Sequence, residues 1–216
     1  MNLAGEYQGV LFDMDGVLLD TMGAHVEAWV AAGVELGLEI DEHEVYLREG
    51  EKGEVSARDF IKAAGLMGTK ARMRALLEAK ERRFAELARA PKLFPGAIEA
   101  LSVCRERGLK IGLVTGTSRA EWQDIFPIEL REYLDASVTG DEVLRGKPNP
   151  EPFLTSAMQL GLPPRRCVAV ENAPFGIRSA NAAGCFVVAV RSYLADEDLG
   201  QAAVLVDDLA AFVTLL

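Results

Sequence analysis

The sequence has few of the residues that build zinc sites, disulfide frameworks or membrane spans. Of its 216 residues, three are cysteine and two are histidine. The cysteines, at positions 104, 167 and 185, are far apart and form no CxxC pair, so we expect buried free thiols in a reducing cytosol and no zinc site. No apolar run approaches the roughly 20 residues of a membrane-spanning helix. The first residues also lack the basic and apolar regions of a signal peptide, so we expect a cytoplasmic protein without a membrane partner.

Basic residues are also scarce. The chain has 23 lysines and arginines against 33 acidic residues, a formal net charge of -10. Nucleic acids and anionic membrane surfaces bind basic faces, so this balance argues against both as partners. A small anionic substrate remains compatible if lysine or arginine is placed locally. We expect a monomer.

The most informative stretch is an apolar run that ends in two carboxylates. Val10 to Phe12 predict a short buried strand, and Asp13, Asp15 and Gly16 follow it directly. Two carboxylates at the carboxyl end of such a strand repel each other and lose hydration, which is costly unless a cation joins them. The pattern indicates a Mg²⁺ site with one aspartate free to attack an electrophile. The alternative is an ordinary acidic turn after a core strand.

The remaining chain alternates between helical and strand patterns in a way that predicts an α/β fold. Residues 22–89 show helical periodicity almost throughout, whereas apolar strands alternate with helices from residue 93 onward. Strands that are apolar on both faces predict a doubly wound parallel sheet covered by helices. We therefore predict a Rossmann-like core formed by residues 1–20 and 92–216, with an α-helical cap inserted at residues 21–91.

Polar groups follow four successive strands, and the carboxyl ends of parallel strands meet at one edge of a sheet. They are Asp13 and Asp15, then Thr115 with Gly116, Thr117 and Ser118, then Lys147, then Glu171 with Asn172. Together they could bind Mg²⁺ and a phosphate group, with Asp13 as attacking carboxylate and Asp15 as proton donor and acceptor. Thr115 and the amides of 116–118 would hold phosphate oxygens, and Lys147 would neutralise charge.

Four motifs in this order resemble the haloacid dehalogenase superfamily, in its phosphatase branch with a helical cap of the β-phosphoglucomutase and phosphoglycolate phosphatase type. They are Asp13-Met-Asp-Gly-Val, Val114-Thr-Gly-Thr, Gly146-Lys-Pro-Asn-Pro and Val170-Glu-Asn-Ala-Pro-Phe-Gly. The resemblance implies that Asp13 is the nucleophile and Asp15 the general acid and base. It also implies that Thr115 and Lys147 bind phosphate, and that Asp13, Asp15, Glu171 and Asn172 hold the metal. The family usually has a second acid where Asn172 stands, so we expect weaker Mg²⁺ binding here.

Cap residues extend the resemblance to β-phosphoglucomutase-like proteins. His25 corresponds to a residue that could orient substrate or time proton transfer, but it could also simply cap the hinge. Lys80 lies roughly where those proteins carry a hinge-side lysine, although its charged helix also fits a solvated face. Ser118 and Arg119 are candidate substrate contacts. In the cap, Arg48, Glu51 and Lys52 could reach the site when the cap closes, while Trp29 and Trp122 are expected to serve packing.

These features predict a Mg²⁺-dependent phosphatase that acts on a small phosphorylated metabolite, of the sugar phosphate or phosphoglycolate type. One alternative is a sugar-phosphate mutase, which would return the phosphoryl group to its substrate. His25 and Lys80 favour that alternative, whereas Asn172 and a poor match at residues 45–56 count against it. A receiver-type regulatory domain or a phosphate-binding protein with little turnover are further alternatives.

Overall fold

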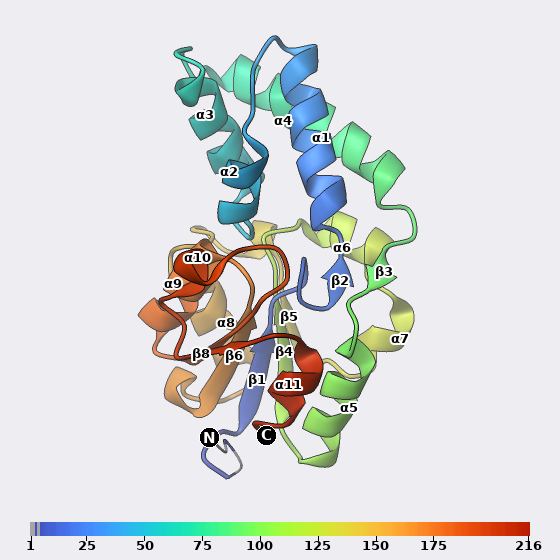
Figure 1. The fold of residues 1–216 in the computed structure, drawn as a ribbon, viewed down its shortest axis with the longest axis vertical. Helices are drawn as coiled ribbons and strands as arrows, with labels where there is room; N and C mark the ends of the chain where they lie inside the picture. Colours follow the sequence, from blue (N-terminus) through green and yellow to red (C-terminus); the bar gives the residue numbers. More distant parts are fainter. Residues whose placement is uncertain (1–2, 4) are drawn as a thin grey trace.

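The computed structural model describes residues 3 and 5–216, and within them it forms one six-stranded parallel sheet flanked by helices (Figure 1). The strand order is β5-β4-β1-β6-β7-β8. The strands are β1 (Gly9–Phe12), β4 (Lys110–Val114), β5 (Ala136–Val138), β6 (Cys167–Glu171), β7 (Phe186–Val190) and β8 (Val204–Val206). The predicted doubly wound α/β fold is confirmed.

The first strand lies in the middle of the sheet and carries the site. Phe12 pairs with Leu113 of β4 on one side and with Val170 of β6 on the other. The pairing continues one residue further, because the amide of Asp13 donates to the carbonyl oxygen of Val170 at 2.9 Å. The ends of β4 and β6 therefore flank Asp13.

Alternate residues of β1 face opposite helical layers. Val10 and Phe12 pack toward α5 (Ala97–Glu106) and α11 (Leu209–Val213), where Phe12 meets Phe212 edge to face with ring centroids 5.8 Å apart. Leu11 packs toward α8 (Glu151–Gln159) and α9 (Pro174–Ala183). Each of these fully buried side chains contributes about 1.5–3 kcal/mol through burial, so the strand is held rigidly on both faces.

Four helices lie between two short strands that pair antiparallel, β2 (Leu19–Asp20) and β3 (Lys92–Leu93). They are α1 (Met22–Glu35), α2 (Glu42–Leu47), α3 (Gly53–Ala63) and α4 (Lys70–Leu87), and they stand above the sheet in Figure 1. They enclose an apolar cluster of their own, which includes Trp29 and Phe60. We keep the division into a core (1–20 and 92–216) and a cap (21–91) as a proposal, in which residues 1, 2 and 4 lie outside the described residues.

The remaining elements are short. They are α6 (Arg119–Ile125), α7 (Ile128–Arg131), α10 (Asp196–Leu199) and the 3₁₀ turns η1 (Gly140–Glu142) and η2 (Pro164–Arg166). Of all these helices, none in the described part of the chain combines the length and the apolar character needed to cross a bilayer.

Candidate active site

Three predicted residues meet at the carboxyl edge of the sheet. Lys147 Nζ lies 2.5 Å from Asp13 Oδ1 and 2.7 Å from Glu171 Oε1. All three side chains are buried. Burial strengthens this charge pairing, and it also makes each charge costly to leave unpaired.

The formal charges of the two acids and the lysine do not cancel. Burial raises the pKa of Asp13 well above its usual range, and the nearby Lys147 offsets this only in part while Glu171 and Asp15 add to it. Burial alone would lower the pKa of Lys147, but Asp13 and Glu171 outweigh it and hold the ammonium charged. With all three groups ionised the cluster would carry one excess negative charge, which a bound cation would neutralise.

Two buried oxygens beside this cluster have no hydrogen-bond partner, namely Asp13 Oδ2 and Asn172 Oδ1. An unpaired buried acceptor costs free energy, and hard cations such as Mg²⁺ bind carboxylate and amide oxygens of this kind. These residues therefore fit the metal expected from the sequence. The described residues contain no group of three or more histidine, cysteine or acidic side chains arranged for a metal, and one of the candidate ligands here is the amide of Asn172.

The side chains of Glu171 and Asn172 lie close against two glycines, and Glu171 is also held by hydrogen bonds. Both oxygens of Glu171 are engaged, since Oε1 accepts from Lys147 and Oε2 accepts from the Asn172 amide at 3.1 Å. A Cβ at Gly176 would lie 2.0 Å from the Glu171 carboxylate, and a Cβ at Gly16 would lie 2.1 Å from the Asn172 side chain. Glycine at these two positions is what lets both side chains reach the edge of the sheet.

Asp15 turns toward the cap. It accepts hydrogen bonds from Thr21 at 2.5 Å and from Thr117 at 3.2 Å, and His25 Nε2 lies 3.4 Å from its Oδ1. Burial raises its pKa, but hydrogen bonding and charge from His25, together with the Thr21 bond, outweigh burial and lower it. The two aspartates of one turn thus have opposite environments.

The loop after β4 lies beside Asp15. Thr115 Oγ1 accepts from the Thr117 amide at 3.1 Å and lies 3.4 Å from Asp15 Oδ2. Ser118 begins α6 and caps it reciprocally with Glu121. Gly116, Thr117 and Ser118 all border a cavity that Asp15 also lines. The predicted phosphate-binding segment is therefore next to the aspartates.

Arg119 does not border this cavity. Asp13, Thr115, Lys147, Glu171 and Asn172 are also absent from its lining, but they lie at the carboxyl edge of the sheet beside Asp15, whereas Arg119 turns away. Its guanidinium binds Ser137 and Glu142 on the neighbouring β5–η1 segment and stacks over Trp122 at 4.7 Å. These partners hold Arg119 at the side of α6, so we do not carry it into the proposed site.

His25 and Lys80 both reach the cavity from the cap. His25 stacks on Phe84 with ring centroids 4.0 Å apart. Lys80 is only 7% exposed, and its ammonium lies 4.4 Å from the Phe84 ring and 3.8 Å from Glu121. The interpretation of Lys80 as a solvated surface residue is therefore wrong, because α4 turns this position toward Glu121 of α6.

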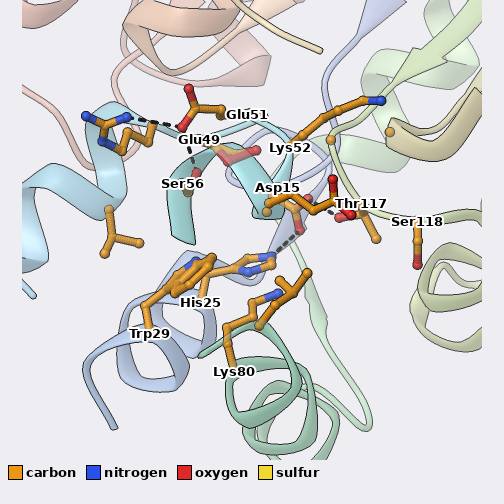
Figure 2. A pocket seen from close by; sticks show the side chains of 18 of the residues that line it. Asp15, His25, Trp29, Glu49, Glu51, Lys52, Ser56, Lys80, Thr117 and Ser118 are labelled. Atoms are coloured by element: carbon orange, nitrogen blue, oxygen red, sulfur yellow. Dashed lines mark hydrogen bonds and ion pairs between the residues drawn. The ribbon is translucent and has the colours of Figure 1, made fainter. Parts of the chain in front are cut away.

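The loop between α2 and α3 closes over the site, as Figure 2 shows. Lys52 Nζ binds the main-chain carbonyls of Val143 at 2.5 Å and Leu144 at 3.2 Å. The α-carbon of Gly50 packs so tightly against Lys147 that an added Cβ would lie 2.4 Å from Cδ of that lysine. Arg48 and Glu51 also border the cavity, but they pair with each other at 3.2 Å.

Glu49 is a site residue that we did not predict. It is 9% exposed, borders the cavity and makes no hydrogen bond or ion pair with the side chains that the structure describes. Burial raises its pKa well above the usual range, and the charges of Asp13 and Asp15 raise it further. The only sequence signal was its place beside glycine in a glycine-interrupted cap segment.

The cavity has a volume of about 340 Å³ and lies between the aspartate turn and the cap helices. This is near the lower end of the range for small-molecule sites. Trp29 borders it while packing edge to face on Phe60 at 5.2 Å, and Trp122 packs on Phe126 at 5.6 Å, so both have the packing contacts that we expected.

Residues 7–184 match the model of the haloacid dehalogenase-like hydrolases. The chain belongs to this family. It is 34% identical over 187 residues to hexitol phosphatase A of Escherichia coli, covering 86% of this chain and 83% of that protein. It is 29% identical over 192 residues to β-phosphoglucomutase of Bacillus subtilis, covering 85% of this chain and 83% of that protein.

A solved structure of CbbY from Rhodobacter sphaeroides in complex with xylulose-(1,5)-bisphosphate is similar as well. It has a TM-score of 0.78 and 26% identity, with 94% of this chain and 95% of that chain covered. The family and these relatives confirm the predicted class: the chain is a phosphatase, a hydrolase of phosphorylated metabolites.

Proposed function

We propose that the protein hydrolyses a small phosphate monoester through an aspartyl-phosphate formed on Asp13. The observation that carries this proposal is the Asp13 carboxylate itself. Its Oδ1 is held by Lys147, while its Oδ2 is buried and unpaired. Lys147 would offset the repulsion between Oδ1 and an incoming phosphate, and Oδ2 remains for the metal.

Asp13 Oδ2 and Asn172 Oδ1 would hold Mg²⁺, with the Asp15 main-chain carbonyl as a further ligand and Glu171 supporting the site through Lys147. When bound, the metal supplies positive charge that neutralises the phosphate and lowers the barrier for an attacking anion. Thr115, Lys147 and the amides of Gly116 and Thr117 would bind the phosphate oxygens.

In the first half-reaction, Asp13 Oδ1 forms a bond to phosphorus as the bond to the leaving oxygen breaks, and Asp15 gives that oxygen a proton. In the second, water attacks phosphorus, Asp15 takes the proton, and phosphate leaves Asp13. His25 Nε2, at 3.4 Å from Asp15, is within reach to exchange that proton.

Hydrolysis of p-nitrophenyl phosphate with Mg²⁺ tests this proposal. We expect turnover by the wild type and a loss of at least about a thousandfold in Asp13→Asn. The matched control is Asp124→Asn, an exposed aspartate on α6, which should keep full activity. Equal turnover by wild type and Asp13→Asn would refute the mechanism. No turnover by the wild type would favour the low-turnover binding protein instead.

The mutase alternative shares the first half-reaction and is favoured by two observations. His25 and Lys80 both border the cavity, and the chain resembles a β-phosphoglucomutase. Product analysis separates the two: a phosphatase releases free phosphate in proportion to substrate consumed, whereas a mutase converts one sugar phosphate into an isomer.

A further inference from the structure

Tyr193 lies where the aspartate turn, the hinge strands β2 and β3, and the cap meet. It belongs to the loop between β7 and α10, and its hydroxyl donates a hydrogen bond to Asp20 Oδ1 of β2 at 2.5 Å. Its ring meets the ring of Phe94, the residue after β3, edge to face with centroids 6.0 Å apart. A Cβ added at Gly16 would lie 3.1 Å from Cε2 of the same ring. One side chain therefore contacts the segments that lead into and out of the cap, and it also lies against the turn that carries Asp15.

The loop that carries Tyr193 is fixed to the core. Ser192 Oγ donates a hydrogen bond to the carbonyl oxygen of Gly16 at 2.5 Å. On the other side of Tyr193, the side chain of Leu194 is buried in the apolar cluster that α8 and α9 form with the sheet. The position of Tyr193 is therefore set by the core and not by the cap.

The cap rests on this tyrosine through Tyr46. The two tyrosine rings stack with centroids 5.4 Å apart and planes 29° apart. Tyr46 also packs against apolar clusters of both the cap and the core, so it lies at the boundary between them. It is the penultimate residue of α2, and the closing segment, residues 48–52, follows this helix directly. Because Gly50 of that segment packs against Lys147, the tyrosine stack supports the cap just before it covers the site.

The hinge ladder alone is too short to fix the angle of the cap. β2 and β3 comprise two residues each and pair only with each other. An isolated two-stranded ladder is marginally stable at best in water, so side-chain contacts have to set the angle between cap and core. Tyr193 supplies such contacts at both strands, through Asp20 and Phe94.

We propose that Tyr193 is a positioning residue that holds the cap closed by packing its ring on Tyr46 of the cap and Phe94 of the hinge, while the bond to Asp20 orients the ring. Tyr193 is not among the described residues that border the cavity, so it acts on the reaction through the closing segment. The inference rests on the proposed phosphatase mechanism, in which the cap covers the site during phosphoryl transfer.

Leucine variants separate this role from a general contribution to stability. They are Tyr193→Leu, Tyr46→Leu and the double variant, with Tyr193→Phe as the conservative change that keeps the ring. The matched control is Tyr7→Leu, because Tyr7 packs on Phe186 at the same centroid distance of 5.4 Å but at the opposite edge of the sheet.

Each protein is melted, assayed with p-nitrophenyl phosphate and Mg²⁺, and examined by hydrogen exchange of a peptide that covers residues 48–52. Hydrogen exchange reports the local opening of the closing segment without any need for turnover.

We expect kcat/KM to fall about three- to tenfold in Tyr193→Leu, the fold-change that corresponds to the loss of one aromatic pair. Tyr46→Leu should lose at least as much, and the double variant no more than Tyr46→Leu, because both changes remove the same contact. Residues 48–52 should exchange faster by a similar factor in all three variants. Tyr193→Phe should recover most of the lost activity, and Tyr7→Leu should melt earlier but keep the wild-type kcat/KM and exchange.

Four results would overturn the inference while leaving the phosphatase mechanism intact. These are wild-type activity and exchange in Tyr193→Leu, equal losses in Tyr7→Leu, losses that multiply in the double variant, and no recovery in Tyr193→Phe. Absence of turnover by the wild type would instead overturn the mechanism, and the exchange of residues 48–52 would still decide whether Tyr193 holds the cap.

Discussion

Lys147 Nζ and Asp13 Oδ1 lie 2.5 Å apart, although the two residues are 134 positions apart in the chain. Asp13 follows the central strand, and Lys147 comes from the loop after η1. This contact joins two distant segments at the edge of the sheet, and the same ammonium also binds Glu171 at 2.7 Å. We therefore expect stability and catalysis to depend on the same lysine.

Lys147→Gln should reduce stability as well as activity. The change leaves the buried carboxylates of Asp13 and Glu171 without their cation, and breaking a buried ion pair typically costs about 3–5 kcal/mol. Urea unfolding without Mg²⁺ would measure this loss. Lys62→Gln, on an exposed face of α3, should change the free energy of unfolding by less than about 0.5 kcal/mol. Equal stability of the two variants would contradict the pairing.

Gly50→Ala tests whether cap closure is needed for turnover. Gly50 has φ +76°, and an added Cβ would lie 2.4 Å from Cδ of Lys147, which cannot retreat because both carboxylates hold it. We expect kcat/KM to fall at least about tenfold, because the loop must lift from the site.

Gly65→Ala is the matched control for Gly50→Ala. Gly65 has φ +74° and nothing within 4 Å of an added Cβ, so this variant carries the same backbone strain of about 1–2 kcal/mol without the clash. It should melt earlier but keep its kcat/KM. Equal activity losses in both variants would show that strain, and not contact with Lys147, is responsible.

Asp15→Asn should slow the hydrolysis of each ester to the extent that its leaving group needs a proton. Nitrophenolate leaves readily without one, whereas an alkoxide does not, so the loss of kcat should be about 10²–10⁴-fold for an alkyl phosphate and smaller for p-nitrophenyl phosphate. Steady-state rates for both esters, compared with Asp124→Asn, measure the difference. Identical losses for the two esters would argue against a proton donor at Asp15.

Asn172→Asp should tighten Mg²⁺ binding. The change restores a second negative charge next to Asp13 Oδ2 without adding bulk, so the apparent Mg²⁺ dissociation constant should fall about tenfold, which corresponds to about 1.4 kcal/mol. EDTA-treated wild type and Asn172→Asp are each titrated with Mg²⁺. The dissociation constant of each protein is measured by calorimetry and, independently, from the Mg²⁺ dependence of its activity. An unchanged or weaker constant would mean that Asn172 is not a ligand.

The sequence was sufficient for those parts of the molecule that local patterns determine. Apolar strands such as Val10 to Phe12 have to be buried on both faces, and parallel strands bring their carboxyl ends together, so the meeting of Asp13, Lys147 and Glu171 could be predicted. The helical character of residues 22–89 was also predicted, since their apolar periodicity is regular, and all four helices α1 to α4 lie within that range.

Long-range packing accounts for what could not be predicted. Glu49 is buried because Gly50 meets Lys147, almost a hundred residues later, and nothing near Glu49 records that contact. Arg119 follows a phosphate-binding motif, but Ser137 and Glu142 of the next segment hold it away from the cavity. Short elements such as α7 and α10 have too few residues to show a period.

The most direct test of the central claim is to trap the phosphoryl group on the enzyme. Wild-type protein is mixed with Mg²⁺ and excess p-nitrophenyl phosphate, quenched in acid within milliseconds, digested with pepsin and examined by mass spectrometry. The account predicts a phosphorylated peptide that contains Asp13, with the phosphoryl group on that residue and absent from Asp13→Asn. A phosphoryl group on any other residue, or its persistence in Asp13→Asn, would contradict the account.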